Sequence, residues 1–504
     1  MASITGNYTS TFTRSDVPAA HKLTELSLCD QTAVAIATCR AMFFRNNGRI
    51  FDDDIMSRAV SQVAQDLPML AGRVQKLNLP LGWSMSDIAI QNSNIGIEFR
   101  VLHVPEKSLE DCGPDTWVMH DITISKPNVP FYIPFLDSGM KLLKGEEPLC
   151  KVQLTHLKDG DILGVSMSHM MTDGVHWPYF MTHLAARYRE LLTGVQIPDG
   201  SPELLSWNGD KQTVSFEKIH QRLLDSGDIS KDWKPKPFPI RARFFDHFRA
   251  LGLLFRNEKQ KVDFNIVSVP RTAFQRLKID VQRIVSRNNP DTIVSTGDIV
   301  QGLASMMVHG SQGKPLFPCK PKTMVVLVQI PGTMESTNTR YFGNSVHPMA
   351  VRFTADELKT VPTTQIEILA KIAAKIRQTT MTLKSDPTTA LQSLYETKQV
   401  VQTSIWKSLA FLAGNRFPYV TCTTNYIGAL KEDSMLDFGL GEEFKSSTVQ
   451  WLVTPLARDM AVIRPSASPY PEGLFFHMTL SKKDSKHLRE LDLFSKLIPE
   501  ASFL

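Results

Sequence analysis

The stretch SHMMTDG occupies residues 168–174 and is the most informative segment of this chain of 504 residues. Upstream of it, alternating apolar residues around a polar turn at 158–161 predict a β-hairpin over 150–168. Downstream, apolar residues at helical spacing predict a helix over 174–192. His169 is therefore expected at the end of a strand, in a strand–turn–helix arrangement that projects its side chain into a cleft.

Helix and strand signals alternate along the remainder of the chain. Apolar residues at helical spacing, with stop and capping signals, predict helices within 52–76, 299–308 and 362–383. Apolar runs predict strands over 324–330, 419–426 and 473–480. This alternation predicts an α/β fold in both halves of the chain.

A proline-rich segment separates the two halves. KPKPFP at residues 234–239 is incompatible with regular structure, because each proline lacks an amide donor and restricts the residue before it. We therefore predict a first domain over 1–205 that carries SHMMTDG. A crossover linker over 206–240 and a second domain over 241–504 are expected to follow.

The composition is that of an ordinary globular protein, with 42% apolar residues, 21% charged residues and a formal net charge of +5. This small positive charge argues against a dedicated nucleic-acid-binding protein. No run of 18 apolar residues predicts a transmembrane helix, and no apolar segment typical of a secretory signal is visible. The six cysteines show no CxxC spacing. We therefore expect a monomer in the reducing cytoplasm.

His169 and Asp173 are the side chains of the first stretch that can carry out chemistry. No other histidine of the chain has Asp four residues later. Histidine suits a general base because its ordinary pKa lies near the pH at which enzymes work. Asp173 can orient the ring or hold the turn, and Gly174 permits close backbone approach or a positive φ. The pattern predicts a catalytic base, although it also fits a hydrogen-bonded histidine at a domain surface.

A second motif, DFGLG, occupies residues 437–441 near the end of the chain. We expect Asp437, Gly439 and Gly441 to have a structural role in a loop. GLGEEF at 439–444 comes close to a dinucleotide-binding pattern, but it ends in Phe and no helical pattern follows. The sequence therefore argues against a nucleotide fold.

In this order, HxxxDG followed by DFGxG resembles the BAHD acyltransferases. Shorter runs fit the same family: HKL at 21–23, LSLCD at 26–30, LPMLAGR at 67–73 and YFGN at 341–344. The resemblance implies two chloramphenicol-acetyltransferase-like domains with an active-site tunnel between them. It also implies an acyl-CoA co-substrate, a small-molecule alcohol or amine as acceptor, no tightly bound cofactor and His169 as general base. The family's motif aspartate is chiefly structural, and its DFGxG loop lies away from the chemistry.

Three features depart from the family pattern. Leu440 stands where the family has Trp, and the strand at 324–330 lacks the Arg that usually pairs with the motif aspartate. No Arg lies between Arg416 and Arg458, where relatives that use shikimate or quinate place one. We therefore expect a distant member whose acceptor is neither shikimate nor quinate. The expected acceptor group is a hydroxyl of a specialised metabolite, with an amine as the less favoured alternative.

The chemistry of acyl transfer suggests further candidate contacts. Thr423 and Thr424 are candidate oxyanion or substrate contacts, since a tetrahedral intermediate needs donors. The segment 231–261 has more Lys and Arg than Asp and Glu. It is either a solvated linker or a source of positive charge for coenzyme A phosphates. Direct attack by the acceptor on the thioester predicts a ternary complex.

Several alternatives remain open on the sequence. A non-ribosomal peptide condensation domain also carries HxxxDG, but it usually has a second His in place of Ser168. A non-catalytic protein of the same fold is another possibility. GVSMS at 164–168 nearly matches a serine nucleophile elbow, with Ser166 as nucleophile. Asp52 to Asp54 form an acidic run that fits a helix start better than a metal site, and no metal site is expected.

Overall fold

The computed structural model describes residues 8–13, 23–32, 37–46, 48–76, 84, 88–91, 96–112, 122–123, 131–134, 136, 140–173, 177–205, 216–237, 261–313, 315–317, 323–329, 344, 346–354, 356–359, 362–404, 420–422, 436–441, 446–453, 460–465 and 472–503.

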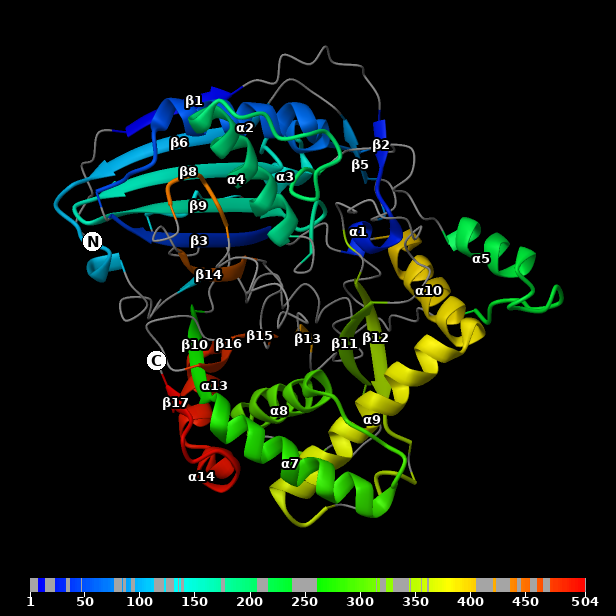
Figure 1. Cartoon of the computed structure of the whole chain (residues 1–504). Coiled ribbons are helices and arrows are strands. Elements are labelled where there is room, and N and C mark those ends of the chain that lie inside the picture. The colour runs from blue at the N-terminus through cyan, green and yellow to red at the C-terminus, as the bar shows by residue number, and fades with distance from the viewer. Residues whose placement is uncertain are drawn as a thin grey trace.

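A six-stranded sheet forms the upper half of the molecule in Figure 1, in the order β1-β6-β8-β9-β3-β14. Its strands are β1 (Tyr8–Thr13), β3 (Ala37–Arg45), β6 (Ile97–Val104), β8 (Cys150–Leu157), β9 (Gly160–Ser168) and β14 (Ser446–Val453). The pair β6 and β8 is parallel, and the other neighbours are antiparallel. The antiparallel pair β8 and β9 confirms the predicted hairpin.

Two helices pack together against this sheet, α2 (Asp53–Asp66) and α4 (Trp177–Thr193). The Asp52 side chain accepts the Ile55 N–H at 2.8 Å and caps α2, so the acidic run is a helix start. After α2 the chain forms the 3-10 turn η1 (Pro68–Ala71), since proline cannot continue the hydrogen-bonding pattern. Both helices confirm the sequence-based expectation within the described residues.

A second sheet forms the lower half, in the order β12-β11-β13-β15-β16-β10-β17, with β7 paired to β10. Its strands are β7 (Ile122–Thr123), β10 (Lys261–Pro270), β11 (Thr323–Gln329), β12 (Val346–Arg352), β13 (Val420–Cys422), β15 (Met460–Pro465), β16 (Gly473–Ser481) and β17 (Ser502–Phe503). The helices of this half are α7 (Arg271–Asn288), α8 (Thr296–Ser311), α9 (Gln365–Ser385), α10 (Pro387–Gln402), α13 (Lys482–Arg489) and α14 (Asp492–Leu497).

These elements confirm the helices and strands predicted for the second half. Helix α8 begins with a capping box, in which Ser295 and Asp298 each accept the other's backbone N–H. The apolar runs become β11, β13 and β16, which lie in one sheet. Helices on one side of a mixed sheet give the α/β arrangement that the alternating signals indicated (Figure 1).

Smaller elements connect the halves. A three-stranded sheet contains β2 (Leu23–Glu25), β5 (Ile88–Gln91) and β4 (Arg73–Lys76). Short helices elsewhere in the described part of the chain are α1 (Leu28–Thr32), η3 (Glu110–Cys112), α3 (Met140–Leu143) and α5 (Phe216–Asp225). Helix α5 lies inside the segment expected to be a linker. Its Phe216 ring contacts Tyr395 on α10, with centroids 5.3 Å apart, so this part of the crossover packs against the second half.

The two halves exchange strands. β14, from the C-terminal part of the chain, pairs with β3 along eight residues of the N-terminal sheet, and β7 pairs with β10 in the second sheet. The predicted linker at 206–240 separates the two halves in sequence. It nevertheless places β14 in the second half, although β14 pairs with the sheet of the first half.

The domain limits, the tunnel, the monomeric state and the cytoplasmic location stay predictions. Among the described helices, none has the length and hydropathy needed to cross a bilayer.

Candidate active site

His169 lies at the first position after β9, as the sequence predicted. The chain turns there, and the N–H of Met171 donates to the carbonyl of Ser168 at 3.0 Å. Further on, the N–H of Trp177 donates to the carbonyl of Asp173 at 3.0 Å where α4 begins. Ser168 and Met170 are buried, whereas His169 keeps part of its surface exposed. The turn therefore leaves His169 partly exposed at the end of a buried strand.

Asn344, from the second half of the chain, holds the His169 ring. Its Oδ1 lies 3.0 Å from His169 Nδ1, and its Nδ2 donates to the His169 carbonyl at 2.7 Å. Asn344 is 4% exposed. A side chain separated from His169 by 175 residues in sequence therefore fixes both the backbone and the ring of the histidine.

Asp30 on α1 anchors Asn344. One carboxylate oxygen accepts the backbone N–H and the Nδ2–H of Asn344, both at 2.8 Å. The other accepts the hydroxyl of Ser27 at 2.6 Å and its backbone N–H at 3.1 Å. Burial raises the pKa of Asp30, and these four donated hydrogen bonds oppose that rise. A chain of hydrogen bonds therefore joins the two halves at the histidine. It runs from Ser27 through Asp30 and Asn344 to His169.

This network settles the protonation pattern of the His169 ring. Asn344 Nδ2 faces two acceptors, the Asp30 carboxylate and the His169 carbonyl, so the amide oxygen must face the ring. His169 Nδ1 therefore carries a proton and donates it to Asn344 Oδ1. In the neutral ring, Nε2 then holds the lone pair that a general base requires.

Desolvation lowers the pKa of His169 below its ordinary value of 6.5. The charge of Asp173 and the hydrogen bond to Asn344 act in the opposite direction. A histidine with a lowered pKa is neutral at neutral pH, which is the state that can accept a proton. The electrostatics of the site therefore favour a base.

Asp173 is almost completely buried, at 1% exposure. Its carbonyl accepts the N–H of Trp177 and, at 3.3 Å, the hydroxyl of Thr172. Burial raises the pKa of the Cys29 thiol, and the negative charges of Asp30 and Asp173 raise it further. Asp173 is thus tied into the turn through its backbone and lies close enough to His169 to influence its protonation.

Asp173→Asn is expected to lower both the melting temperature and the rate, because it alters a buried group in the turn. Since the Asp173 charge raises the pKa of His169, its removal lowers that pKa further. The acid limb of the kcat/KM profile should therefore move to lower pH. Asp291→Asn, at an exposed position, is the control for loss of one charge. An unchanged melting temperature would leave Asp173 with an orienting role alone.

Ser166 and the four cysteines whose side chains are described, Cys29, Cys39, Cys112 and Cys150, are poorly suited to nucleophilic catalysis. Ser166 is buried within β9, and its hydroxyl donates to the Cys39 sulfur at 3.1 Å. Burial raises the pKa of Cys39 to about 12 and that of Cys112 to about 11. It also raises the pKa of Cys29 and Cys150. Thiols in this state stay protonated and unreactive.

Phe438 secures the DFGLG loop to the N-terminal half. Its ring is 2% exposed and makes edge-to-face contacts with Phe44, Phe51 and Tyr188, with centroids 5.7, 4.9 and 5.8 Å away. Leu440, in the position where the family has Trp, belongs to the same core. The loop therefore packs onto α4 and the sheet just before the chain enters β14.

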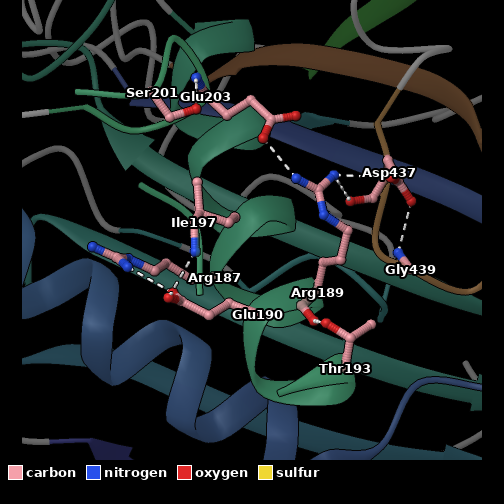
Figure 2. Close-up of polar contacts among 9 residues, drawn as sticks. All are labelled: Arg187, Arg189, Glu190, Thr193, Ile197, Ser201, Glu203, Asp437 and Gly439. Atoms are coloured by element: carbon pink, nitrogen blue, oxygen red, sulfur yellow. Dashed lines mark hydrogen bonds and ion pairs between the residues drawn. The ribbon is translucent and has the colours of Figure 1, made fainter. Parts of the chain in front are cut away.

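Polar contacts at the surface complete the loop (Figure 2). Arg189 on α4 donates to the Asp437 carboxylate at 2.9 Å and to Glu203 at 2.6 Å, and the Gly439 N–H donates to Asp437 at 2.8 Å. Gly439 and Gly441 have φ values of 76° and 100°, which favour glycine. A Cβ on Gly441 would lie 2.7 Å from Arg49 Nη1. These contacts support a structural role for Asp437, Gly439 and Gly441.

Some predicted site residues lie outside the described part of the chain. They are Gly174, Thr423 and Thr424. Their roles stay predictions, as does the role of the basic stretch 231–261, most of which is also outside it. Conversely, the sequence contained Asp30 and Asn344 within LSLCD and YFGN, but nothing in those runs indicated that the two residues meet at His169.

Comparisons with known proteins agree with this architecture. The Transferase family model matches residues 8–484. TRI101 of F. sporotrichioides, complexed with coenzyme A and T-2, superimposes with a TM-score of 0.65 at 15% identity, over 96% of this chain and 99% of that one. Vinorine synthase gives 0.60 at 13% identity over 97% of both chains. These likenesses show the fold, two chloramphenicol-acetyltransferase-like α/β halves.

Peptide synthetases also resemble parts of the chain. The first condensation domain of the calcium-dependent antibiotic synthetase has a TM-score of 0.52 at 11% identity, over 94% of this chain and 96% of that one. A mycosubtilin synthase protein of Bacillus subtilis is 38% identical over 64 residues, which are 12% of this chain and 2% of that protein.

The match to the family model covers nearly the whole chain and argues against a non-catalytic protein of the same fold. The chain therefore belongs to the Transferase family and is a BAHD acyltransferase, as its HxxxDG and DFGLG motifs predicted.

Proposed function

We propose that this protein transfers an acyl group from coenzyme A to a hydroxyl of a small specialised metabolite, with His169 as general base. The observation that carries the proposal is the contact of His169 Nδ1 with Asn344 Oδ1 at 3.0 Å. This contact makes Nε2 the basic atom and holds the ring in one orientation. Amines are a less favoured class of acceptor.

The proposed reaction needs one proton relay. His169 Nε2 takes the proton of the acceptor hydroxyl as its oxygen attacks the thioester carbonyl carbon. The tetrahedral intermediate then collapses, the carbon–sulfur bond breaks, and the imidazolium returns the proton to the departing thiolate. The products are an ester and free coenzyme A, and His169 ends neutral.

The classes of acyl donor and acceptor that we propose are based on the ligands bound in structures of similar proteins. TRI101 forms complexes with coenzyme A together with T-2 or deoxynivalenol, which supports acyl-CoA as co-substrate and a small organic molecule as acceptor. Acyl-CoA enters and leaves in each turnover, so no tightly bound cofactor is proposed.

The assay that tests the proposal measures thiol release from acetyl-CoA with a panel of alcohols and amines that includes T-2 and deoxynivalenol. With an active pair, initial-rate lines at varied concentrations of both substrates should intersect, because direct attack requires a ternary complex. Parallel lines with an acyl group trapped on the protein would contradict the mechanism. If no acceptor of the panel increases the rate of thiol release, the proposed substrate class is contradicted.

A condensation reaction on a carrier-bound thioester is the second candidate. The 64-residue match to the mycosubtilin synthase protein favours it, whereas Ser168 stands where condensation domains usually have a second His. The same panel, run with an acyl group on a phosphopantetheinylated carrier protein in place of acetyl-CoA, separates the two. Faster transfer from the carrier than from coenzyme A would favour the condensation reaction.

Asn344→Ala is expected to lower kcat by about 10²-fold, the typical cost of misplacing a catalytic group by ~1 Å. KM should change little, because Asn344 acts through His169. The hydrogen bond to Asn344 raises the pKa of His169, so its loss should move the acid limb of the kcat/KM profile to lower pH. Gln392→Ala is the matched control, since Gln392 also joins distant segments through an amide, 2.9 Å from the Lys236 carbonyl. A lower melting temperature without a change in the pH profile would make Asn344 merely structural.

A further inference from the structure

Three neighbouring strands of the N-terminal sheet place ionisable side chains in one row. His103 on β6 pairs in register with His156 on β8, and His156 pairs with Asp161 on β9. The two imidazole rings stack with centroids 4.8 Å apart and 18° between their planes. Asp53, the first residue of α2, reaches this row. Four side chains from four separate elements therefore meet here.

Asp161 orients the His156 ring. One of its carboxylate oxygens lies 2.7 Å from His156 Nδ1, and the other accepts the N–H of Phe51 at 2.8 Å. Asp161 is 1% exposed, so its position is fixed. His156 therefore has its Nδ1 proton directed at Asp161 and turns Nε2 toward Asp53. Histidines that bind metals typically have such a carboxylate on the other ring nitrogen.

The contact between His156 and Asp53 requires a cation. Nε2 lies 2.7 Å from Oδ1 of Asp53, and in the neutral ring both atoms are acceptors. A proton on His156 Nε2 would let it donate a hydrogen bond to Asp53, but it would leave His103 without a role in the cluster. The Nε2 atom of His103 lies 3.6 Å from the other Asp53 oxygen, beyond hydrogen-bond distance. A metal ion would engage all three side chains, whose ligand atoms lie within 4.8 Å of one another.

We propose that Asp53, His103 and His156 form a binding site for a divalent transition-metal ion, for which zinc fits best. Two imidazole nitrogens and one carboxylate oxygen are a common zinc ligand set. Ligand atoms ~2.0–2.1 Å from a tetrahedral zinc ion are roughly 3.4 Å apart. His103 Nε2 lies 3.6 Å from Oδ2 of Asp53 and His156 Nε2 lies 2.7 Å from its Oδ1, so the Asp53 carboxylate must shift to present one oxygen to the ion. His103 and Asp53 have 52% and 40% of their side-chain surface exposed, which leaves room for water as fourth ligand.

The site has a structural role, separate from acyl transfer. Asp161 and His169 lie near opposite ends of β9, and at about 3.3 Å a residue this strand places them roughly 25 Å apart. The bound ion joins the first turn of α2 to β6 and β8. The sequence predicted no metal site, because the acidic run that contains Asp53 fits a helix start. The two histidines are 50 and 103 residues away from Asp53 and show no short ligand spacing with it.

The test uses the full-length protein after treatment with a chelator. Calorimetric titration should show saturable binding of one Zn²⁺ per chain, and Zn²⁺ should raise the melting temperature by binding only the folded state. Co²⁺ as spectroscopic probe should give visible bands of a tetrahedral site without a thiolate-to-metal band. No saturable binding, or a thiolate band that places the ion at a cysteine, overturns the proposal.

Variants of the cluster distinguish this site from other histidines. Asp161→Asn should weaken Zn²⁺ binding by about 10- to 100-fold, the usual cost of losing an orienting partner. His103→Ala, at a half-exposed position, should weaken it by more than that, and it should leave acyl transfer unchanged. His487→Ala, on α13, is the matched control and should bind like the parent. Unchanged Zn²⁺ binding in His103→Ala overturns the proposal.

Discussion

Replacing His169 with Ala is expected to lower kcat by about 10²- to 10⁴-fold, the usual contribution of a positioned general base. Burial lowers the pKa of this histidine, and Asn344 fixes its Nδ1 proton, so the wild-type ring is a neutral base ready at Nε2. Proton transfer takes place only in the transition state. The loss should therefore fall on kcat and kcat/KM alike. Thiol release from acetyl-CoA in the presence of an acceptor measures it.

Two controls make this result specific. The variant should melt at nearly the temperature of the parent and bind coenzyme A equally well, because the turn is held by backbone contacts of its buried neighbours. His487→Ala should retain full activity. An active His169→Ala protein, or an acyl group trapped on Ser166 or a cysteine, would contradict the role of His169 and revive a covalent mechanism.

The local parts of the fold could be predicted from the sequence, because their signals are local. The hairpin of β8 and β9 follows from alternation around a polar turn, and α2 and α8 follow from capping side chains before apolar periodicity. The position of His169 at a strand end depends on these neighbours alone. This is why a single stretch of sequence located the candidate base.

The remaining features depend on pairings between distant segments. Nothing in residues 446–453 indicated that β14 would pair with β3 rather than with the second sheet. Likewise, Asn344 and Asp30 meet at His169 only because the two halves come together there. The partner of a polar side chain across hundreds of residues is a property of the tertiary structure and has no periodicity to reveal it.

The DFGLG loop shows which forces hold the exchanged strand in place. The ion pair of Arg189 with Asp437 is partly exposed, and such pairs contribute about 0–1 kcal/mol. Phe438, in contrast, is buried among Phe44, Phe51 and Tyr188, and burial of a large aromatic side chain contributes several times more. The aromatic contact is therefore expected to dominate the attachment of the loop, and with it the start of β14.

Phe438→Ala is accordingly expected to lower the free energy of unfolding by about 3–5 kcal/mol, the range measured for buried Phe replaced by Ala. Denaturant unfolding measures this loss, and Phe438→Leu should lose less because more of the volume stays filled. Ile279→Ala, at a position 60% exposed, is the control and should change stability by less than about 0.5 kcal/mol.

Hydrogen exchange locates the effect of Phe438→Ala. If Phe438 fastens β14 to the N-terminal sheet, the amides of β14 and β3 should lose protection before those of α7, which lies in the other half. His169 is held by a different set of contacts, so the rate per folded molecule should change little. A stability loss below about 1 kcal/mol, or equal loss of protection in β14 and α7, would show that β14 is held by its strand pairing alone.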